Sequence, residues 1–160
     1  VYESVIALKS KNKEFRKGIF LNNKQLSNFT DILIKDYQIK CNTMHDQVKS
    51  LSGGNIQKIV SAREIVECKK ILIANQPTRG IDIGSVMTLH EKLKQLQSKN
   101  KGILLISSDL KEVYDLAESV IVLYEGRIVA RIKNIKNVSE EQLGKYMLGV
   151  EVQDESEASL

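Results

Sequence analysis

Short apolar runs alternate with segments of helical periodicity in the second half of the chain, and this alternation constrains the fold more than any other feature. These segments follow one another over residues 70–74, 84–98, 103–107, 110–117 and 119–124. The longest, 84–98, carries aliphatic side chains at helical spacing, namely Val86, Leu89, Leu93 and Leu96. Strands that alternate with helices form a parallel sheet with helices on its faces. We therefore predict an α/β fold that contains a partial parallel sheet.

Turn and cap residues mark the borders of the C-terminal elements. Glu125-Gly126 separates two apolar runs, 119–124 and 127–132, and predicts a tight hairpin turn. Two helices are expected at 110–117 and before Gly149. Each begins with a capping side chain followed three residues later by Glu or Gln: the pairs are Asp109 with Glu112 and Ser139 with Gln142. The C-terminal part therefore predicts a helix, a β-hairpin and a final helix.

Residues 1–50 predict mainly helix and loop. Leu26, Phe29 and Leu33 recur at helical spacing, and Asn22 or Asn23 is suited to cap that helix. The polar and basic stretch 10–18 predicts an exposed connection. A further helix is expected after the glycine pair Gly53-Gly54, with one face formed by Ile56, Ile59, Val60 and Val66.

The composition is that of an ordinary globular domain. The chain has 160 residues, of which 28% are charged and 42% hydrophobic. No apolar run approaches the roughly 18 residues that a membrane span needs. The first residue is Val rather than Met, and we expect the sequence to begin inside a longer protein. Cys41 and Cys68 have no metal-ligand spacing, so two free thiols are favoured over a disulfide.

Positive charge gathers near the N-terminus, and negative charge at the C-terminus. The basic residues are Lys9, Lys11, Lys13, Arg16 and Lys17. A solvated loop is the favoured interpretation. Binding to nucleic acid or to anionic lipid headgroups is less favoured, since no aromatic residues are interleaved with the charge. The last ten residues hold four acids and no base, and we expect 151–160 to form a disordered tail.

Ser52-Gly53-Gly54 stands immediately before a predicted helix. Two glycines let the backbone approach a ligand closely, and the first amides of a helix lack intrahelical partners. Such a helix start attracts an anion, and the Ser52 hydroxyl adds a donor. The alternative, from these residues alone, is a simple glycine-rich helix entry without a ligand.

Five segments in order resemble the landmarks of the ATP-binding cassette (ABC) ATPases. Residues 51–58, Leu-Ser-Gly-Gly-Asn-Ile-Gln-Lys, resemble the signature motif and its helix. Residues 71–78, Ile-Leu-Ile-Ala-Asn-Gln-Pro-Thr, resemble the Walker B strand, and 79–82, Arg-Gly-Ile-Asp, resemble the D-loop. Residues 103–109 and 124–129 are similar to the switch strand and to the hairpin that commonly follows it. The resemblance is closest to the C-terminal part of the second cassette in tandem ATPases that import simple sugars or nucleosides.

The resemblance implies an incomplete P-loop NTPase (ABC ATPase) fold. Residues 1–50 would be part of a helical subdomain, and 51–150 the C-terminal part of the ATPase core, with residues 151–160 as the tail. The phosphate-binding loop Gly-x-x-x-x-Gly-Lys-[Ser/Thr] is absent, and the nearest candidate, Lys17-Gly18, has no second Gly-Lys pair. In the family, the strand that leads to this loop lies centrally in the sheet. Its absence predicts open strand edges, and dimerisation or strand exchange between copies.

Three positions that carry catalysis in the family hold other residues here. Asn75 and Gln76 occupy the positions of the Walker B Asp and Glu, and Ser108 occupies that of the switch histidine. An amide is a poor general base and a weak partner for Mg²⁺, which prefers carboxylate oxygen. Neither His45 nor His90 falls at the switch position, and both are expected at the surface. The resemblance thus predicts a degenerate site, and this chain alone is predicted to be inactive.

The resemblance also implies a role for the signature loop in trans. ABC cassettes pair head to tail, so Ser52, Gly53, Gly54 and Asn55 would close over a nucleotide held by the partner cassette, and Asp82 would lie at the dimer interface. ATP and Mg²⁺ are the implied cofactors of the complete transporter, with none expected to bind this chain tightly and no metal site of its own.

The implied partners are the N-terminal cassette of the same polypeptide and permease subunits that contact the helical subdomain. The implied location is cytoplasmic, at the cytoplasmic face of the cell membrane. Nucleic acid is not expected as a partner. Two other functions remain open: a non-catalytic interaction or regulatory module, and an ATPase head of the chromosome-maintenance (SMC) type. The second lacks support, since such heads have no Pro-Thr-Arg-Gly run and the chain has no coiled-coil heptads.

Overall fold

Helices and short strands alternate along the chain, as the apolar periodicity predicts. The structure, a computed structural model, describes residues 1–7, 9 and 12–153. Its elements are α1 (Tyr2–Ile6), β1 (Arg16–Lys17), β2 (Phe20–Leu21), α2 (Asn23–Asp36), α3 (Gly53–Glu67), β3 (Ile71–Asn75), α4 (Ile83–Ser98), β4 (Gly102–Ile106), α5 (Leu110–Leu116), β5 (Val120–Tyr124), β6 (Arg127–Ile132) and α6 (Glu140–Met147). Single 3₁₀ turns occupy Lys13–Phe15, Val48–Ser50 and Ile135–Asn137. Within the described residues, no helix is long and apolar enough to cross a membrane.

Contacts divide the chain into two units, Val1–Leu104 and Leu105–Leu160. In the first unit, α1 packs on α2 and α3, and α3 packs on α4. The buried side chains there include Leu26, Leu33, Ile59, Leu89 and Leu93. The predicted boundary between a helical subdomain and the ATPase core, at residue 50, does not coincide with this division and stays a prediction.

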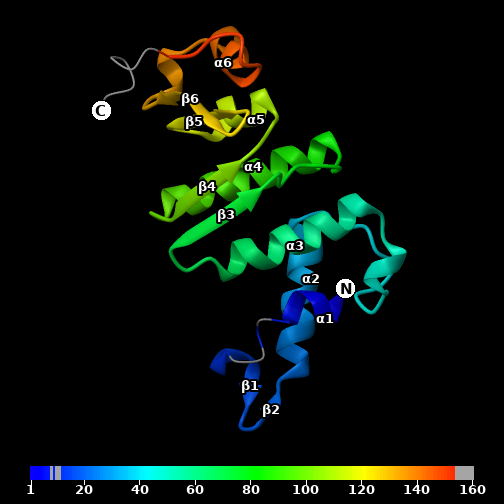
Figure 1. Cartoon of the computed structure of the whole chain (residues 1–160). Helices are drawn as coiled ribbons and strands as arrows, with labels where there is room; N and C mark the ends of the chain where they lie inside the picture. The colour runs from blue at the N-terminus through cyan, green and yellow to red at the C-terminus, as the bar shows by residue number, and fades with distance from the viewer. Residues whose placement is uncertain (8, 10–11, 154–160) are drawn as a thin grey trace. The chain divides into compact units, whose positions relative to one another are not determined.

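The strands form three separate two-stranded sheets in the described part of the chain: β1 with β2, β3 with β4, and β5 with β6. Helix α4 connects β3 to β4, and the arrows of these two strands point the same way in Figure 1. This strand–helix–strand unit is the partial parallel sheet expected from the sequence. The two residues Leu72 and Ala74 are buried on one face of β3, whereas Ile71 and Ile73 are exposed on the other.

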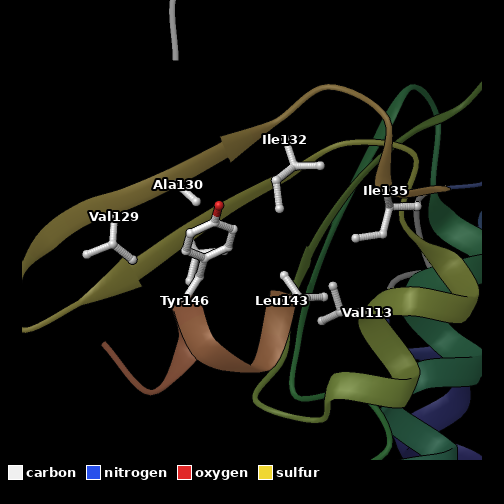
Figure 2. Packing of buried hydrophobic residues seen from close by; sticks show 8 residues of the cluster. Val113, Val129, Ala130, Ile132, Ile135, Leu143 and Tyr146 are labelled. Atoms are coloured by element: carbon white, nitrogen blue, oxygen red, sulfur yellow. The ribbon is translucent and has the colours of Figure 1, made fainter. Parts of the chain in front are cut away.

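The core of the second unit lies between the β5–β6 hairpin and the helices α5 and α6 (Figure 2). Leu143 and Tyr146 of α6 pack against β6, and Val113 joins them from α5. The full cluster consists of Val113, Val122, Val129, Ala130, Ile132, Ile135, Leu143 and Tyr146. The hairpin is not polar on its other side, since Ile121, Leu123 and Ile128 are exposed there.

The predicted caps and turn are confirmed. Asn22, rather than Asn23, caps α2 by accepting a hydrogen bond from the Gln25 amide. Asp109 accepts from the amides of Lys111 and Glu112 at the start of α5. The Ser139 hydroxyl accepts from the Gln142 amide at the start of α6. Glu125 and Gly126 both have positive φ, 46° and 77°, which is the conformation of a two-residue hairpin turn.

Four expectations are corrected. The basic stretch near the N-terminus is not a uniformly solvated loop, since Lys9 is buried: it pairs with Glu67, and its ammonium lies 4.8 Å from the centroid of the Phe29 ring. An unpredicted hairpin, β1–β2, follows it. Ser10 and Lys11 lie outside the described residues. The predicted apolar face of α3 is wrong in part, because Val60 and Val66 are exposed although Ile59 is buried.

The fourth correction concerns the tail. Residues 151–153 are held against the second unit, because the Gln153 amide donates to the Val129 carbonyl over 2.8 Å and its side chain accepts from the Arg131 amide. Glu151 also pairs with Lys145. The rest of the predicted tail, 154–160, lies outside the described residues. Cys41 and Cys68 are free thiols, as expected.

Candidate phosphate-facing loop

The loop 51–55 leads directly into α3, and its own side chains fix the helix start. Ser52 is the N-cap, with φ of −64° and ψ of 154°, and its hydroxyl oxygen accepts from the Asn55 amide. The Asn55 side-chain amide donates to the same oxygen over 2.9 Å. Both bonds use the oxygen as acceptor, so the Ser52 hydroxyl proton stays available as a donor. The first amides of α3, at Gly53 and Gly54, have no intrahelical acceptor.

The two glycines meet different surroundings. A Cβ at Gly54 would lie 2.7 Å from the Gly80 carbonyl oxygen and 3.5 Å from the Ile81 Cα, so backbone packs directly on this glycine. A Cβ at Gly53 would meet nothing within 4 Å. Gly54 is therefore required by the fold, whereas Gly53 leaves an open backbone that a ligand can approach closely.

Helix α3 is tied to the loop that follows β3 by side chains as well. The Gln57 side-chain amide donates to the Pro77 carbonyl over 3.3 Å. The Lys58 ammonium lies 3.1 Å from an Asp82 carboxylate oxygen and donates to the Gln38 carbonyl, also over 3.1 Å. Lys58 is only 6% exposed. The start of α3 and the segment 77–82 are thus held as one arrangement.

Asp82 also caps α4. One carboxylate oxygen accepts from the Ser85 amide over 3.0 Å, and the other accepts from the Ser85 hydroxyl over 2.8 Å. These bonds and the bond from Lys58 hold the pKa of Asp82 well below its usual range. The carboxylate is consequently ionised at neutral pH and anchors two helices through one side chain.

Lys58 and Asn55 have structural roles that the sequence reasoning missed. The Asn55 side-chain oxygen accepts from the Lys40 amide over 2.8 Å, so this residue links the loop to the segment after α2. Lys58 shares a buried face with Ala62 and Ile65, at positions i, i+4 and i+7. The sequence contained one sign of this role: Lys58 falls on the same helical stripe as the apolar residues Ala62 and Ile65. A lysine at such a position is expected to have a partner, because a buried charge requires one.

Asn75 and Gln76, at the end of β3, carry neutral side-chain amides and take no part in the contacts described above. Asn75 is exposed at the last strand position, and Gln76 has a φ of 49°, in the left-handed region. The Gln76 carbonyl accepts from the Arg79 amide over 3.1 Å, which closes a turn. Neutral amides do not fit Mg²⁺ well. No cluster of three or more His, Cys, Asp or Glu residues suited to a metal occurs among the described residues.

The remaining predicted positions are placed as follows. Ser108 is exposed in the turn before α5, where the Asp109 amide donates to the Ser107 hydroxyl. It belongs to the second unit, whereas the loop 51–55 and the amides at 75 and 76 belong to the first. His45 is exposed and its ring lies 5.8 Å from that of Tyr2. His90 is half-buried, so the expectation of a surface position holds only in part.

A glycine-rich loop opens α3, packs on the turn after β3 and is followed by a strand–helix–strand unit. This arrangement agrees with the ATP-binding cassette fold expected from the sequence. Comparison with solved structures shows the same fold. A dimeric bacterial ABC transporter cassette superimposes with a TM-score of 0.65, at 20% sequence identity, over 80% of this chain and 53% of that chain.

Curated relatives show which kind of ABC ATPase the chain is similar to. The chain is 38% identical over 117 residues to the guanosine import ATP-binding protein NupO of Bacillus subtilis, which covers 73% of this chain and 23% of that protein. It is 34% identical over 144 residues to the ribose import ATP-binding protein RbsA of Oceanobacillus iheyensis, covering 90% of this chain and 29% of that protein. The chain thus spans about a quarter of the length of these relatives. No family model matches it.

The chain belongs to the ABC ATPases, and its homologues are import ATP-binding proteins of the sugar and nucleoside class.

Proposed function

We propose that loop 51–55 of this chain completes an ATP site in an importer of sugars or nucleosides, and that a partner cassette holds the phosphates of that ATP. The observation that carries the proposal is that the helix-start loop is intact and fixed through Gly54 and Lys58, whereas residues 75 and 76 are neutral amides. The substrate class is supported by the relatives, which are named as guanosine import and ribose import ATP-binding proteins. The dimeric cassette among the solved structures supports a partner.

In this role, the residues of the loop act as donors to an anion. The amides of Gly53 and Gly54 and the Ser52 hydroxyl proton would face the terminal phosphate, since helix starts favour negative charge. Gly53 would allow the phosphate to approach the backbone, because nothing lies within 4 Å of its Cβ position. Asn55 would hold the Ser52 oxygen in place through its 2.9 Å bond.

Hydrolysis is assigned to the partner's residues rather than to Asn75, Gln76 and Ser108. None of these three supplies a carboxylate or an imidazole. ATP and Mg²⁺ serve the complete transporter, and no step is routed through a metal at the amides of this chain. Alone, the chain is proposed to have no ATPase activity.

The proposed partners and location follow from the same role. The partner cassette would be the N-terminal half of the same polypeptide, with Asp82 at the interface. Residues 1–50 would contact permease subunits, which places the chain at the cytoplasmic face of the membrane, peripheral to it. Residues 51–150 would form the core of the composite site.

Ser52→Asp separates the two tasks of Ser52 and tests the proposal. Aspartate is as good an N-cap as serine, so α3 should form normally. Its negative charge would repel a phosphate, and its carboxylate has no proton to donate. In the import ATPase assembled with its partner cassette, we expect kcat to fall by about 10²-fold or more, the cost typical of removing one such donor. Gln76→Glu is expected to leave kcat nearly unchanged, because this amide serves the other site.

The circular dichroism spectrum and urea midpoint of Ser52→Asp should match those of the parent chain. Unchanged ATPase activity in a folded Ser52→Asp variant would show that the loop does not face a reacting nucleotide. A Gln76→Glu variant that gained activity on its own would show instead that the amide site is the hydrolytic one.

A non-catalytic interaction module is the second candidate, favoured by the two amides at 75 and 76. Titration with a fluorescent ATP analogue distinguishes the candidates. The composite-site proposal predicts weak binding to this chain alone and tighter binding when a complete cassette is added. Equal signals with and without the added cassette would favour the interaction module.

A further inference from the structure

The β1–β2 hairpin, Arg16–Leu21, projects from the rest of the first unit beyond α2 (Figure 1). Arg16 pairs with Leu21 and Lys17 with Phe20, so Gly18 and Ile19 form a two-residue turn. Gly18 has a φ of 66°, which a glycine adopts without strain. The turn is therefore tight and presents Ile19 at its end.

Three consecutive apolar side chains of this hairpin face water: Ile19, Phe20 and Leu21, which we call the hairpin tip. Ile19 is 87% exposed and Phe20 is 72% exposed. Neighbouring strand residues point to opposite faces, so neither face of the hairpin is covered. Single exposed apolar residues are ordinary, whereas a continuous group on a projecting turn marks an interaction site.

The base of the hairpin is anchored, so the tip is presented in a fixed direction. Phe15 is buried, and its ring centroid lies 5.2 Å from that of Phe29 on α2. The Asn22 amide donates to the Phe15 carbonyl over 2.9 Å, which closes the hairpin at its open end. An unsupported two-stranded hairpin would be marginal in water; here α2 supplies the packing.

Positive charge flanks the tip on both sides in the sequence. The cations of residues 12–25 are all exposed, and Glu14 is the single acid of that segment: the cations are Lys13, Arg16, Lys17 and Lys24. An apolar tip flanked by cations is complementary to a surface that is negative outside and apolar beneath. A polyanion such as nucleic acid would satisfy the charges but would leave Ile19 and Phe20 in water.

We propose that the hairpin tip Ile19–Leu21 inserts into an anionic lipid surface while the cations Arg16 and Lys17 contact the headgroups. A protein partner fits the hairpin less well, since a stable interface buries about 800 Å² on each side. Three side chains on a convex turn offer far less. This inference goes beyond the composite ATP site and does not depend on it, because none of its residues belongs to the loop 51–55. It assigns only the hairpin to lipid and leaves the proposed permease contact to the rest of residues 1–50.

The absence of tryptophan from the chain gives a direct experiment. Phe20→Trp places one tryptophan in the tip, and Ile83→Trp places one at a strongly exposed position of α4 as the matched control. Each variant of the full chain is mixed with vesicles of phosphatidylcholine alone or of phosphatidylcholine with phosphatidylglycerol. We expect a blue shift of the emission for Phe20→Trp with the anionic vesicles only, and none for Ile83→Trp.

Charge reversal tests the electrostatic half. Lys17→Glu in the Phe20→Trp background is expected to weaken vesicle binding by at least about fivefold, and added salt should weaken it similarly. No blue shift with anionic vesicles, or an equal shift in the Ile83→Trp control, would overturn the proposal. A shift that follows protein concentration without vesicles would identify a contact between copies of the chain instead, and would also overturn it.

Discussion

Gly53 and Gly54 are neighbours in the sequence but have different tasks, which substitution by alanine separates. The Cβ of Gly54→Ala would lie 2.7 Å from the Gly80 carbonyl oxygen, a backbone atom that cannot turn away. We expect this variant to lose about 1–3 kcal/mol of unfolding free energy, the usual cost of overpacking. Gly53→Ala should be neutral or slightly stabilising, since its Cβ meets open space and alanine favours the helix.

Urea unfolding followed by circular dichroism measures both values. Equal losses for the two variants would contradict the packing of Gly54 on the segment 80–81. If the composite site is correct, Gly53→Ala should nevertheless reduce ATPase activity in the assembled protein, because its new methyl group occupies the path of the phosphate.

Asp82 gives a pH-dependent prediction at the same scale. Hydrogen bonds from Ser85 and Lys58 lower its pKa in the folded chain. A carboxyl whose pKa is lowered on folding stabilises the fold above its unfolded pKa of about 3.9, and this contribution is lost as the pH falls through the folded-state pKa. We therefore expect Asp82→Asn to be less stable than the parent chain at pH 7, with a difference that shrinks as the pH falls from about 4 toward about 2.

Urea midpoints of both chains over this pH range provide the measurement. Lys58→Met is a useful companion variant, because it removes one donor while the two bonds from Ser85 stay. A difference between Asp82→Asn and the parent that stays constant over the whole range would mean that the negative charge of Asp82 contributes nothing.

At the scale of elements, the β5–β6 hairpin is a well-predicted structure with one unfavourable residue. Glu125 adopts a φ of 46°, where a residue with a Cβ is strained by about 1–2 kcal/mol. Asparagine tolerates this conformation, and Asn-Gly is the preferred pair for such a turn. We expect Glu125→Asn to raise the unfolding free energy by about 0.5–1 kcal/mol.

Thermal unfolding of the variant, monitored by circular dichroism, tests this expectation. Gly126→Ala is the opposite control, since its φ of 77° disfavours alanine and should lower stability. A Glu125→Asn variant with a lower melting temperature would show that the Glu125 side chain makes a contribution larger than its backbone strain.

Helix α3 shows where element-scale prediction is incomplete. Its start was predictable, because Ser52 and the glycine pair carry a local signal. Its buried face was not, since Val60 and Val66 are exposed while Lys58 is buried. A prediction from apolar periodicity places every valine in the core and every lysine at the surface. Lys58 departs from it because Asp82 and the Gln38 carbonyl, both distant in sequence, supply its partners.

At the scale of the whole molecule, the exposed face of the β3–β4 sheet predicts self-association. Ile71, Ile73 and Leu104 are exposed although parallel strands are ordinarily covered on both faces. We expect the chain to form dimers or larger species whose fraction rises with concentration. Ile73→Lys should weaken this association by roughly tenfold or more, since burying one isoleucine contributes about 1.5–3 kcal/mol.

Light scattering after size exclusion, at several concentrations, gives the mass. Ile83→Lys is the control: it removes an isoleucine outside the sheet that is even more exposed, 82% against 66% for Ile73, and should leave the association unchanged. A monomeric mass at all concentrations would contradict the prediction, and equal weakening by both variants would place the contact elsewhere.

The sequence by itself determined the order of strands and helices from α3 onward, the caps at Asn22, Asp109 and Ser139, and the turn at Glu125-Gly126. It also identified the loop 51–55. All of these depend on neighbouring residues, whose conformational preferences act over a few positions. The fold class followed from their alternation.

Only the tertiary structure decided which residues meet across long separations. It brought Gly54 against Gly80, Lys58 against Asp82 and Lys9 against Glu67, and it formed the β1–β2 hairpin on α2. The physical reason is that burial and ion pairing depend on partners remote in the chain, whereas the conformational preferences of a residue depend only on its near neighbours in the sequence.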